Sequence, residues 1–339
     1  MRRALPELSL VAALRNEQYG GDLFGRARSF LRNVAWLSRR EHVPVEVIFV
    51  EWCPLPDRPP LADVLSRSES PGSLLVRIVS VPKDIAATRF DRADEIPLWI
   101  FAAKNVGVQR ARSSFVLATN PDVLFTRALF RAIAKRSLGA GSFYRTNRYD
   151  VAGVPLDASP RAQLARCGRS VVRVNLLGGS VRFERPTGGL RLVRAIRSYC
   201  SEQRSKQPGS PESRAARPTE WIHTNAAGDF FLAHRRFWDE LRGYPEFASA
   251  GHLDSYLCVM ATSAGARQVI LDGRRRLYHL EHPRAIDWDV SQPPAHYVVP
   301  FETFLDDASE MLLAGRPTVF NDESWGLAEI DLPEATVRW

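Results

Sequence analysis

The chain has 339 residues, of which 45% are hydrophobic and 25% are charged. This balance excludes a globally disordered chain, and the length allows one large domain or one domain with an appendage. The formal net charge of +8 favours anionic partners such as nucleotides, phospholipid surfaces or nucleic acid, although a basic solvated surface would carry the same charge.

Cysteine usage and hydropathy indicate the compartment. Four cysteines, at positions 53, 167, 200 and 258, are scattered without a CxxC pair. This distribution fits neither a disulfide framework nor a cysteine zinc site, and it favours a reducing compartment. No apolar run approaches the ~20 residues that span a bilayer. The first apolar stretch is too short, and too soon followed by charges, for a secretion signal. We therefore expect a cytoplasmic protein, with contact at a membrane surface left open.

Short apolar runs alternate with amphipathic stretches in the first third of the chain. The runs with the length and composition of buried parallel strands are 8–14, 45–50, 74–81 and 115–118. Helices are expected from a cap at Asp22 to residue 40, at 61–66, and from Pro97 onward, where proline suits a first helical turn. This alternation predicts an α/β fold with a doubly wound, mostly parallel, Rossmann-like nucleotide-binding sheet.

The middle of the chain is irregular, and order returns after residue 220. A strand is expected at 139–145 and a strand-like fragment at 171–177, whereas the polar, proline-containing stretch 201–219 indicates a mobile loop or linker. The later predicted strands are 230–233, 268–271 and 277–280, and the later predicted helices are 234–241, 255–264 and 301–313.

Polar side chains follow the predicted strands at their carboxyl ends, where open α/β sheets bind ligands. Asn120-Pro121-Asp122 follows the fourth strand and offers a carboxylate to a metal, although ordinary turn chemistry explains the same residues. Asn16 and Glu17 end the first strand and Glu51 ends the second, where a ribose or base would lie. Lys104 is placed to reach a diphosphate, or else to be a solvated helix charge.

The C-terminal half supplies two further carboxylates and a pair of histidines. Asp254 directly precedes a predicted helix, so it is either a general base for an acceptor hydroxyl or a helix cap. Asp229 is the rival base, or it binds acceptor hydroxyls. His279 and Glu281 lie on one face of a predicted strand end, with His282 just beyond. Each histidine is either a metal ligand or a structural residue.

Five motifs occur in an order that resembles the GT-A fold glycosyltransferases, most closely the inverting family 2-like group. They are Ala103-Lys104-Asn105-Val106-Gly107, Asn120-Pro121-Asp122, Ala227-Gly228-Asp229, His252-Leu253-Asp254, and His279 or His282. The match covers about 8–122 and 225–282. The resemblance implies Asp254 as catalytic base and Asp229 for substrate, with Asp122, His279 and His282 as the metal ligands.

The resemblance also implies a donor site and shows one departure. The residues expected to contact the nucleotide are Asn16, Glu17, Glu51, Lys104, Asn105 and Asn120. Asn120 stands where the family usually has its first aspartate, so its neutral amide would contact ribose or water. The motif then offers a metal only one anionic ligand, Asp122.

The same resemblance divides the chain. A GT-A glycosyltransferase domain is expected at 1–290, and a C-terminal extension at 291–339. Within the domain, 1–126 would be the nucleotide-sugar-binding half and 221–284 the acceptor and catalytic half. Between them, 140–220 would be a variable insertion that includes the flexible loop 201–219.

The implied activity is metal-dependent transfer of a sugar from a nucleoside-diphosphate sugar to an acceptor hydroxyl, with inversion, in glycan or glycoconjugate synthesis. Mn²⁺ or Mg²⁺ would neutralise the leaving phosphate, and histidine ligation favours Mn²⁺. The acceptor would be a glycan, a lipid-linked molecule or a small molecule, and no nucleic acid partner is expected, since the sequence has no basic strands interleaved with aromatic residues. The alternatives are a nucleotidyltransferase acting on a sugar phosphate and a non-catalytic nucleotide- or glycan-binding protein of the same fold. Retention stays open if Asp254 only orients the acceptor.

Overall fold

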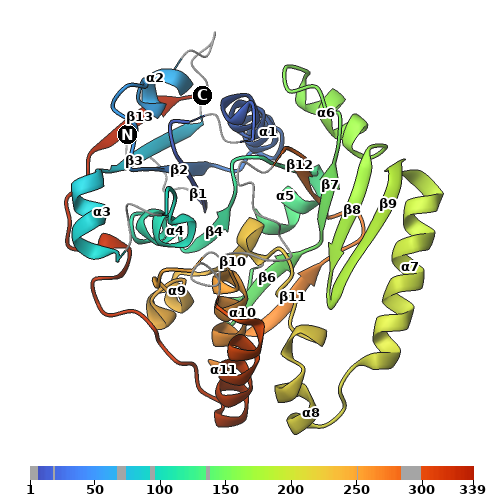
Figure 1. Cartoon of the computed structure of the whole chain (residues 1–339). Helices are drawn as coiled ribbons and strands as arrows, with labels where there is room; N and C mark the ends of the chain where they lie inside the picture. The colour runs from blue at the N-terminus through green and yellow to red at the C-terminus, as the bar shows by residue number, and fades with distance from the viewer. Residues whose placement is uncertain are drawn as a thin grey trace.

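The computed structural model describes residues 7–17, 20–66, 74–91, 96–134, 138–249, 251–283 and 299–339. Within these residues the chain forms two sheets that lie side by side (Figure 1). The central sheet consists, in spatial order, of β11 (Arg267–Leu271), β6 (Ser142–Thr146), β10 (Phe230–His234), β4 (Phe115–Thr119), β1 (Leu8–Leu14), β2 (Val45–Trp52), β3 (Leu75–Val81) and β13 (Glu334–Arg338). The second sheet consists of β5 (Val123–Phe125), β12 (Leu277–Leu280), β7 (Arg148–Val151), β8 (Val171–Leu176) and β9 (Gly179–Thr187).

The central sheet is mostly parallel, as the sequence predicted. Strand β1 pairs in parallel with β2 and β4, β2 with β3, and β6 with β11, whereas β10 and β13 run antiparallel to their neighbours. The first predicted strand coincides with β1, and the other three lie within about two residues of β2, β3 and β4. The expected α/β fold class is therefore confirmed.

The apolar runs are continuous because helices cover both faces of the central sheet. Leu8, Leu10 and Leu14 of β1 pack in one core with α1, α2 and α5, while Val11 and Ala13 pack in the other with α4, α9, α10 and α11. An inner parallel strand must therefore be apolar on both faces. The helices on these faces are α1 (Leu23–Glu41), α2 (Leu61–Leu65), α3 (Lys83–Arg89), α4 (Ile100–Gln109), α5 (Arg127–Ile133), α9 (Arg235–Leu241), α10 (Leu253–Ser263) and α11 (Phe301–Ala314).

The prediction of a flexible loop at 201–219 is wrong. Helix α7 (Gly189–Lys206) runs into this stretch, and α8 (Pro211–Ala216) and a 3₁₀ turn (Pro218–Glu220) occupy the rest. The Ser210 side chain caps α8 by accepting from the Ser213 N–H at 3.2 Å, and Ala215 is buried. The sequence indicated a loop because α8 and the 3₁₀ turn bury very few apolar side chains, so helical periodicity is hardly visible. Helix α6 (Pro160–Cys167), on the same side of the molecule, was likewise not predicted.

The C-terminal tail is more ordered than its sequence indicates. The predicted helix at 301–313 is α11, but the final strand β13 was not expected. It pairs with β3, and Arg77 of β3 donates to both carboxylate oxygens of Glu334 at 2.7 Å. The predicted boundary at 290–291 lies outside the described residues. None of the helices in the described ranges is both long and apolar enough to cross a membrane.

Candidate active site

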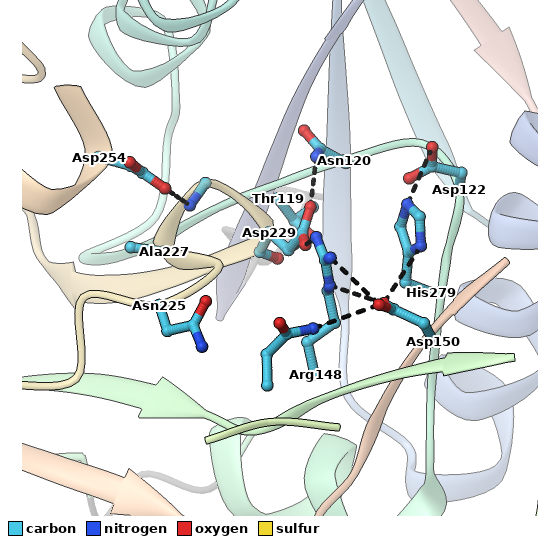
Figure 2. A network of polar contacts seen from close by, with 12 residues as sticks. Thr119, Asn120, Asp122, Arg148, Asp150, Asn225, Ala227, Asp229, Asp254 and His279 are labelled. Atoms are coloured by element: carbon cyan, nitrogen blue, oxygen red, sulfur yellow. Dashed lines mark hydrogen bonds and ion pairs between the residues drawn. The ribbon is translucent and has the colours of Figure 1, made fainter. Parts of the chain in front are cut away.

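A carboxylate and two imidazoles meet where β4 ends. Asp122 separates β4 from β5, and β12 pairs with β5 so that His279 lies opposite Val123. The Nε2 atoms of His279 and His282 lie 3.7 Å and 3.1 Å from Oδ2 of Asp122. Figure 2 shows Asp122 and His279 pointing at each other across this junction. The strand pairing therefore joins two motifs that are more than 150 residues apart.

The donor atoms of this cluster fit a divalent cation. The three ligand atoms all lie within 4.8 Å of one another. The Nδ1 atom of His282 lies 2.9 Å from the carbonyl of Pro283, so an Nδ1–H can donate there while Nε2 lies 3.1 Å from Oδ2 of Asp122. Such a contact is favourable only with a proton or a cation between the two groups. The Oδ1 atom of Asp122 is also buried and accepts no hydrogen bond from the described residues.

The electrostatics of the cluster favour positive charge between its members. Burial alone would raise the pKa of Asp122, but His279 and His282 outweigh it and hold that pKa at about 2. Burial lowers the pKa of His279, whereas Asp122 and Asp150 raise it, and the two carboxylates prevail. Asp122 is therefore ionised at neutral pH, and the site attracts cations.

Asp150 forms a second layer behind His279. Its Oδ1 atom lies 3.4 Å from Nδ1 of His279 and 2.8 Å from Nε of Arg148, and its Oδ2 atom pairs with Arg173. Asp150, His279 and Glu281 also satisfy the spacing for a cation. However, two guanidinium groups already neutralise Asp150, so a cation there would meet repulsion. The Asp122 cluster is the better metal site, with Asp150 orienting His279.

Asp229 and Asn120 belong to a continuous polar network beside this cluster (Figure 2). One carboxylate oxygen of Asp229 accepts from the Asn120 amide and the other from Arg148. The Oδ1 atom of Asn120 accepts from the Lys104 ammonium at 2.7 Å, and that ammonium also donates to the Gly228 carbonyl at 2.7 Å. An amide can accept from Lys104 while donating to Asp229, which an ionised carboxylate cannot do, and this explains why position 120 holds no acid.

Lys104 is completely buried inside this network. Burial lowers its pKa to about 8, and the carboxylates of Asp229, Asp254 and Asp122 limit the fall. Lys104 is therefore not a solvated helix charge. Its position lets it hold the Asn120 loop against the Gly228 loop.

Asp254 lies on the far side of the Gly228 loop from Asp122 (Figure 2). Its Oδ2 atom accepts from the Gly228 N–H at 2.6 Å and its Oδ1 atom from the Ser255 N–H at 3.0 Å. Helix α10 begins at Leu253 with His252 at the cap position, so Asp254 lies in the first turn and is not the cap. Unlike Asp229, which is 3% exposed, Asp254 is only partly buried.

The loops that present these two aspartates have unusual backbones. Ala226, before Asp229, has φ 52°, and His252, before Asp254, has φ 63°. Left-handed conformations of residues other than glycine cost roughly 1 kcal/mol or more and concentrate at functional sites. The backbone strain therefore coincides with the candidate acceptor side of the site.

The other predicted nucleotide contacts are engaged within the protein. Asn16 accepts from the Leu55 N–H at 2.6 Å and donates to the Leu55 carbonyl at 3.0 Å. Glu51 accepts from the Leu61 N–H at 2.7 Å and from Ser80 at 2.8 Å. These two residues shape the loop after β2, and direct contact with a nucleotide stays a prediction.

Two further predicted contacts lie in different settings. The Asn105 side chain binds both backbone groups of Tyr244 and donates to Glu246 at 2.9 Å, so it points away from the network around Lys104. Glu17 is partly exposed and lies 3.6 Å from Arg15 in a loose ion pair. Of these two, only Glu17 has a side chain that an incoming nucleotide could reach without breaking buried hydrogen bonds.

Arg148 and Asp150 were not singled out from the sequence. Both lie in β7, two residues apart, and so share one face of the second sheet. The only sequence signal is this alternation of an arginine and an aspartate around Tyr149 in a short strand. The residues that Arg148 and Asp150 contact at the site, Asp229 and His279, are distant in the sequence.

No protein-family model and no curated protein matches the sequence. Among solved structures, the chain is similar to GalNAc-T7 with UDP, GalNAc and Mn²⁺, at 11% identity over 91% of this chain and 48% of that chain, with a TM-score of 0.47. It is also similar to residues 1–349 of S. aureus TarS in complex with UDP-GlcNAc, at 12% identity over 94% of this chain and 69% of that one, with a TM-score of 0.46. The chain spans about half the length of the GalNAc-T7 chain.

Proposed function

We propose that the protein is a metal-dependent glycosyltransferase that moves a sugar from a nucleoside-diphosphate sugar to an acceptor hydroxyl, with inversion at the sugar carbon. The observation that carries the proposal is the convergence of Asp122, His279 and His282 at the carboxyl end of β4. Doubly wound α/β folds bind nucleotides at this edge of the sheet, and the carboxylate and two imidazoles of the cluster can hold a cation there.

Asp122, His279 and His282 would hold the metal, with Asp150 fixing the orientation of His279. A bound divalent cation would neutralise the negative charge that grows on the departing diphosphate. Two imidazoles with a single carboxylate favour Mn²⁺ over Mg²⁺, because Mg²⁺ prefers an all-oxygen shell. With Asn120 committed to Lys104 and Asp229, the donor phosphates would complete the coordination.

Asp254 is the better candidate for the base that takes the proton from the acceptor hydroxyl. Asp229 is buried, and both of its carboxylate oxygens are held, by Asn120 and Arg148. Asp254 is partly exposed, and its two hydrogen bonds come from backbone N–H groups that orient the carboxylate. Each oxygen retains a lone pair that can accept from a hydroxyl. Asp229 then positions the loop between donor and acceptor.

The test combines ligand binding with turnover. Thermal unfolding would be followed with a panel of nucleoside diphosphates and their sugars, with and without Mn²⁺. We expect a Mn²⁺-dependent rise in melting temperature with at least one nucleotide. We also expect release of the nucleoside diphosphate when an acceptor is added to the nucleotide sugar. A panel without any Mn²⁺-dependent shift would contradict it.

A second assay distinguishes the proposed glycosyltransferase from a nucleotidyltransferase. A nucleotidyltransferase would release pyrophosphate from a nucleoside triphosphate and a sugar 1-phosphate, whereas the proposed enzyme would not. The configuration of the new glycosidic bond, read by proton NMR, decides between inversion and retention.

A further inference from the structure

The positive charge of this protein is concentrated in one part of the chain. Residues 160–217 contain thirteen of the 46 basic residues but three of the 38 acidic ones. This segment therefore carries +10, and the remaining residues together carry −2. A general preference for arginine would not produce such a separation, because it would spread basic residues along the whole chain.

The charged side chains of this segment point to solvent. Twelve of the thirteen belong to exposed residues; the exception is Arg173, which pairs with Asp150 at the candidate site. Lys206 forms an ion pair with Glu202, and Arg217 forms one with Glu220. The arginines that form no ion pair with any described residue are Arg161, Arg166, Arg169, Arg182, Arg185, Arg191, Arg194, Arg197, Arg204 and Arg214.

Helix α7 gives part of this charge a linear arrangement. Its inner face packs Leu192, Ile196 and Tyr199 into the core of the second sheet. Its outer face carries Arg191, Arg194, Arg197 and Arg204, a stripe about 20 Å long at 1.5 Å per residue. Figure 1 shows α7 along the outer edge of the molecule beside β9.

We propose that the surface formed by α7, β9 and α6 docks on a bilayer that contains anionic phospholipids. Clusters of basic residues on an amphipathic helix bind such surfaces through the negative potential of the headgroups. Leu190, at the start of the arginine stripe, is 74% exposed. An apolar side chain beside arginines suits the boundary between headgroups and acyl chains.

Two features favour a bilayer over a nucleic acid. Single-stranded nucleic acids are held by exposed aromatic side chains that stack on bases, but Phe183 and Tyr199 of this surface are packed against its core. The exposed Leu190 would gain nothing from a soluble polyanion, whereas burial in a bilayer removes it from water.

Sedimentation with lipid vesicles tests the proposal without any turnover assay, so its outcome is independent of the proposed enzymatic function. The protein should bind vesicles of phosphatidylcholine mixed with phosphatidylglycerol, should release on addition of salt, and should not bind phosphatidylcholine alone. Replacing Arg191, Arg194 and Arg197 together by glutamine should weaken the binding by about a hundredfold, since each basic group near such a surface contributes about fivefold.

The matched control replaces three exposed arginines that form no ion pair with the described residues and belong to other elements, Arg39→Gln in α1, Arg316→Gln just after α11 and Arg338→Gln in β13. It should change vesicle binding by less than about twofold. Leu190→Ser should weaken binding to vesicles but leave retention on heparin unchanged. Equal loss in the two triple variants, equal binding to neutral vesicles, or tighter binding to RNA than to anionic vesicles would each overturn the proposal.

Discussion

Leu280 donates its backbone N–H to the carbonyl of Asp122 at 2.9 Å. The strand that carries His279 is thereby tied to the residue that His279 faces. The geometry of the cation site depends on this backbone bond and on the pairing of β12 with β5, in addition to the three side chains. A site supported in this way is preorganised, which lowers the cost of binding a cation.

Asp122→Asn should remove most of the affinity for Mn²⁺. The change keeps the size of the side chain but deletes the negative charge that balances a cation between two imidazoles. A loss of at least about tenfold is expected in isothermal titration with Mn²⁺. Asp84→Asn, an exposed change in α3, is the matched control and should bind Mn²⁺ as the unchanged protein does. Equal affinities in the two variants would contradict the assignment of the cation site.

Asp254→Asn should separate binding from turnover. If Asp254 takes the acceptor proton, the variant should keep its Mn²⁺-dependent nucleotide binding while the rate of sugar transfer falls by about 10²–10⁴-fold. Asp229→Asn should behave differently, because it removes one of the two carboxylates that pair with the Arg148 guanidinium and leaves only Asp150. That variant should lose stability, measured by urea unfolding, by about 1–3 kcal/mol. Full transfer activity in Asp254→Asn would assign the base to another residue.

Asn120→Asp should destabilise the protein, although aspartate is the residue typical of the resembled family. The new carboxylate could still accept from Lys104, but it would face the Asp229 carboxylate without an N–H to donate. The expected loss is about 1–3 kcal/mol in urea unfolding at neutral pH. Asn120→Ala removes both hydrogen bonds, including the one from Lys104, without adding charge. A smaller loss in Asn120→Asp than in Asn120→Ala would show that repulsion between the carboxylates is unimportant.

Glu246 should make stability depend on pH. Burial raises its pKa to about 7, and the hydrogen bonds from Asn105 and the Gly326 N–H only partly offset the burial. The folded protein therefore keeps this proton up to about pH 7, whereas the unfolded chain releases it near pH 4.5. Between these values the folded state binds more protons, so the free energy of unfolding falls as pH rises, by up to about 3 kcal/mol.

The measurement for Glu246 is urea unfolding at about pH 5 and about pH 8. Glu246→Gln keeps an acceptor for Asn105 and Gly326 but cannot ionise, so its stability should lack this contribution. It should match the unchanged protein at the lower pH and exceed it at the higher pH. The same pH dependence in both proteins would place the responsible group elsewhere.

The sequence predicted those elements whose signal is local. Strand β1 is apolar at every position except Ser9 because helices bury both of its faces, and the Asp22 cap is confirmed by its 2.8 Å bond from the Gly25 N–H. Helix α7 escaped prediction because one narrow face meets the second sheet while arginines fill the rest. Strand β13 escaped because its pairing with β3 joins segments about 250 residues apart.

The candidate site was predictable as a set of residue types but not as a network. The motifs containing Asp122, His279 and His282 were recognised separately, and the structure places all three together. The roles of Asn120 and Lys104 could not be predicted, since they follow from a buried carbonyl at Gly228 and a carboxylate at Asp229. Which contacts a buried polar side chain makes depends on tertiary packing, of which the sequence carries no local sign.

The second sheet has a consequence for how such a protein can change during evolution. Its strand β12 joins β5, beside Asp122, to β7, which carries Arg148 and Asp150. The arginine-rich surface is continuous with these strands through β8 and β9. Residues 160–217 could be exchanged freely for another sequence only if their backbone shared no hydrogen bonds with the strands of the site. Because β9 pairs with β8, β8 with β7, and β7 with β12, any variation in these residues must preserve the strand pairing that supports His279.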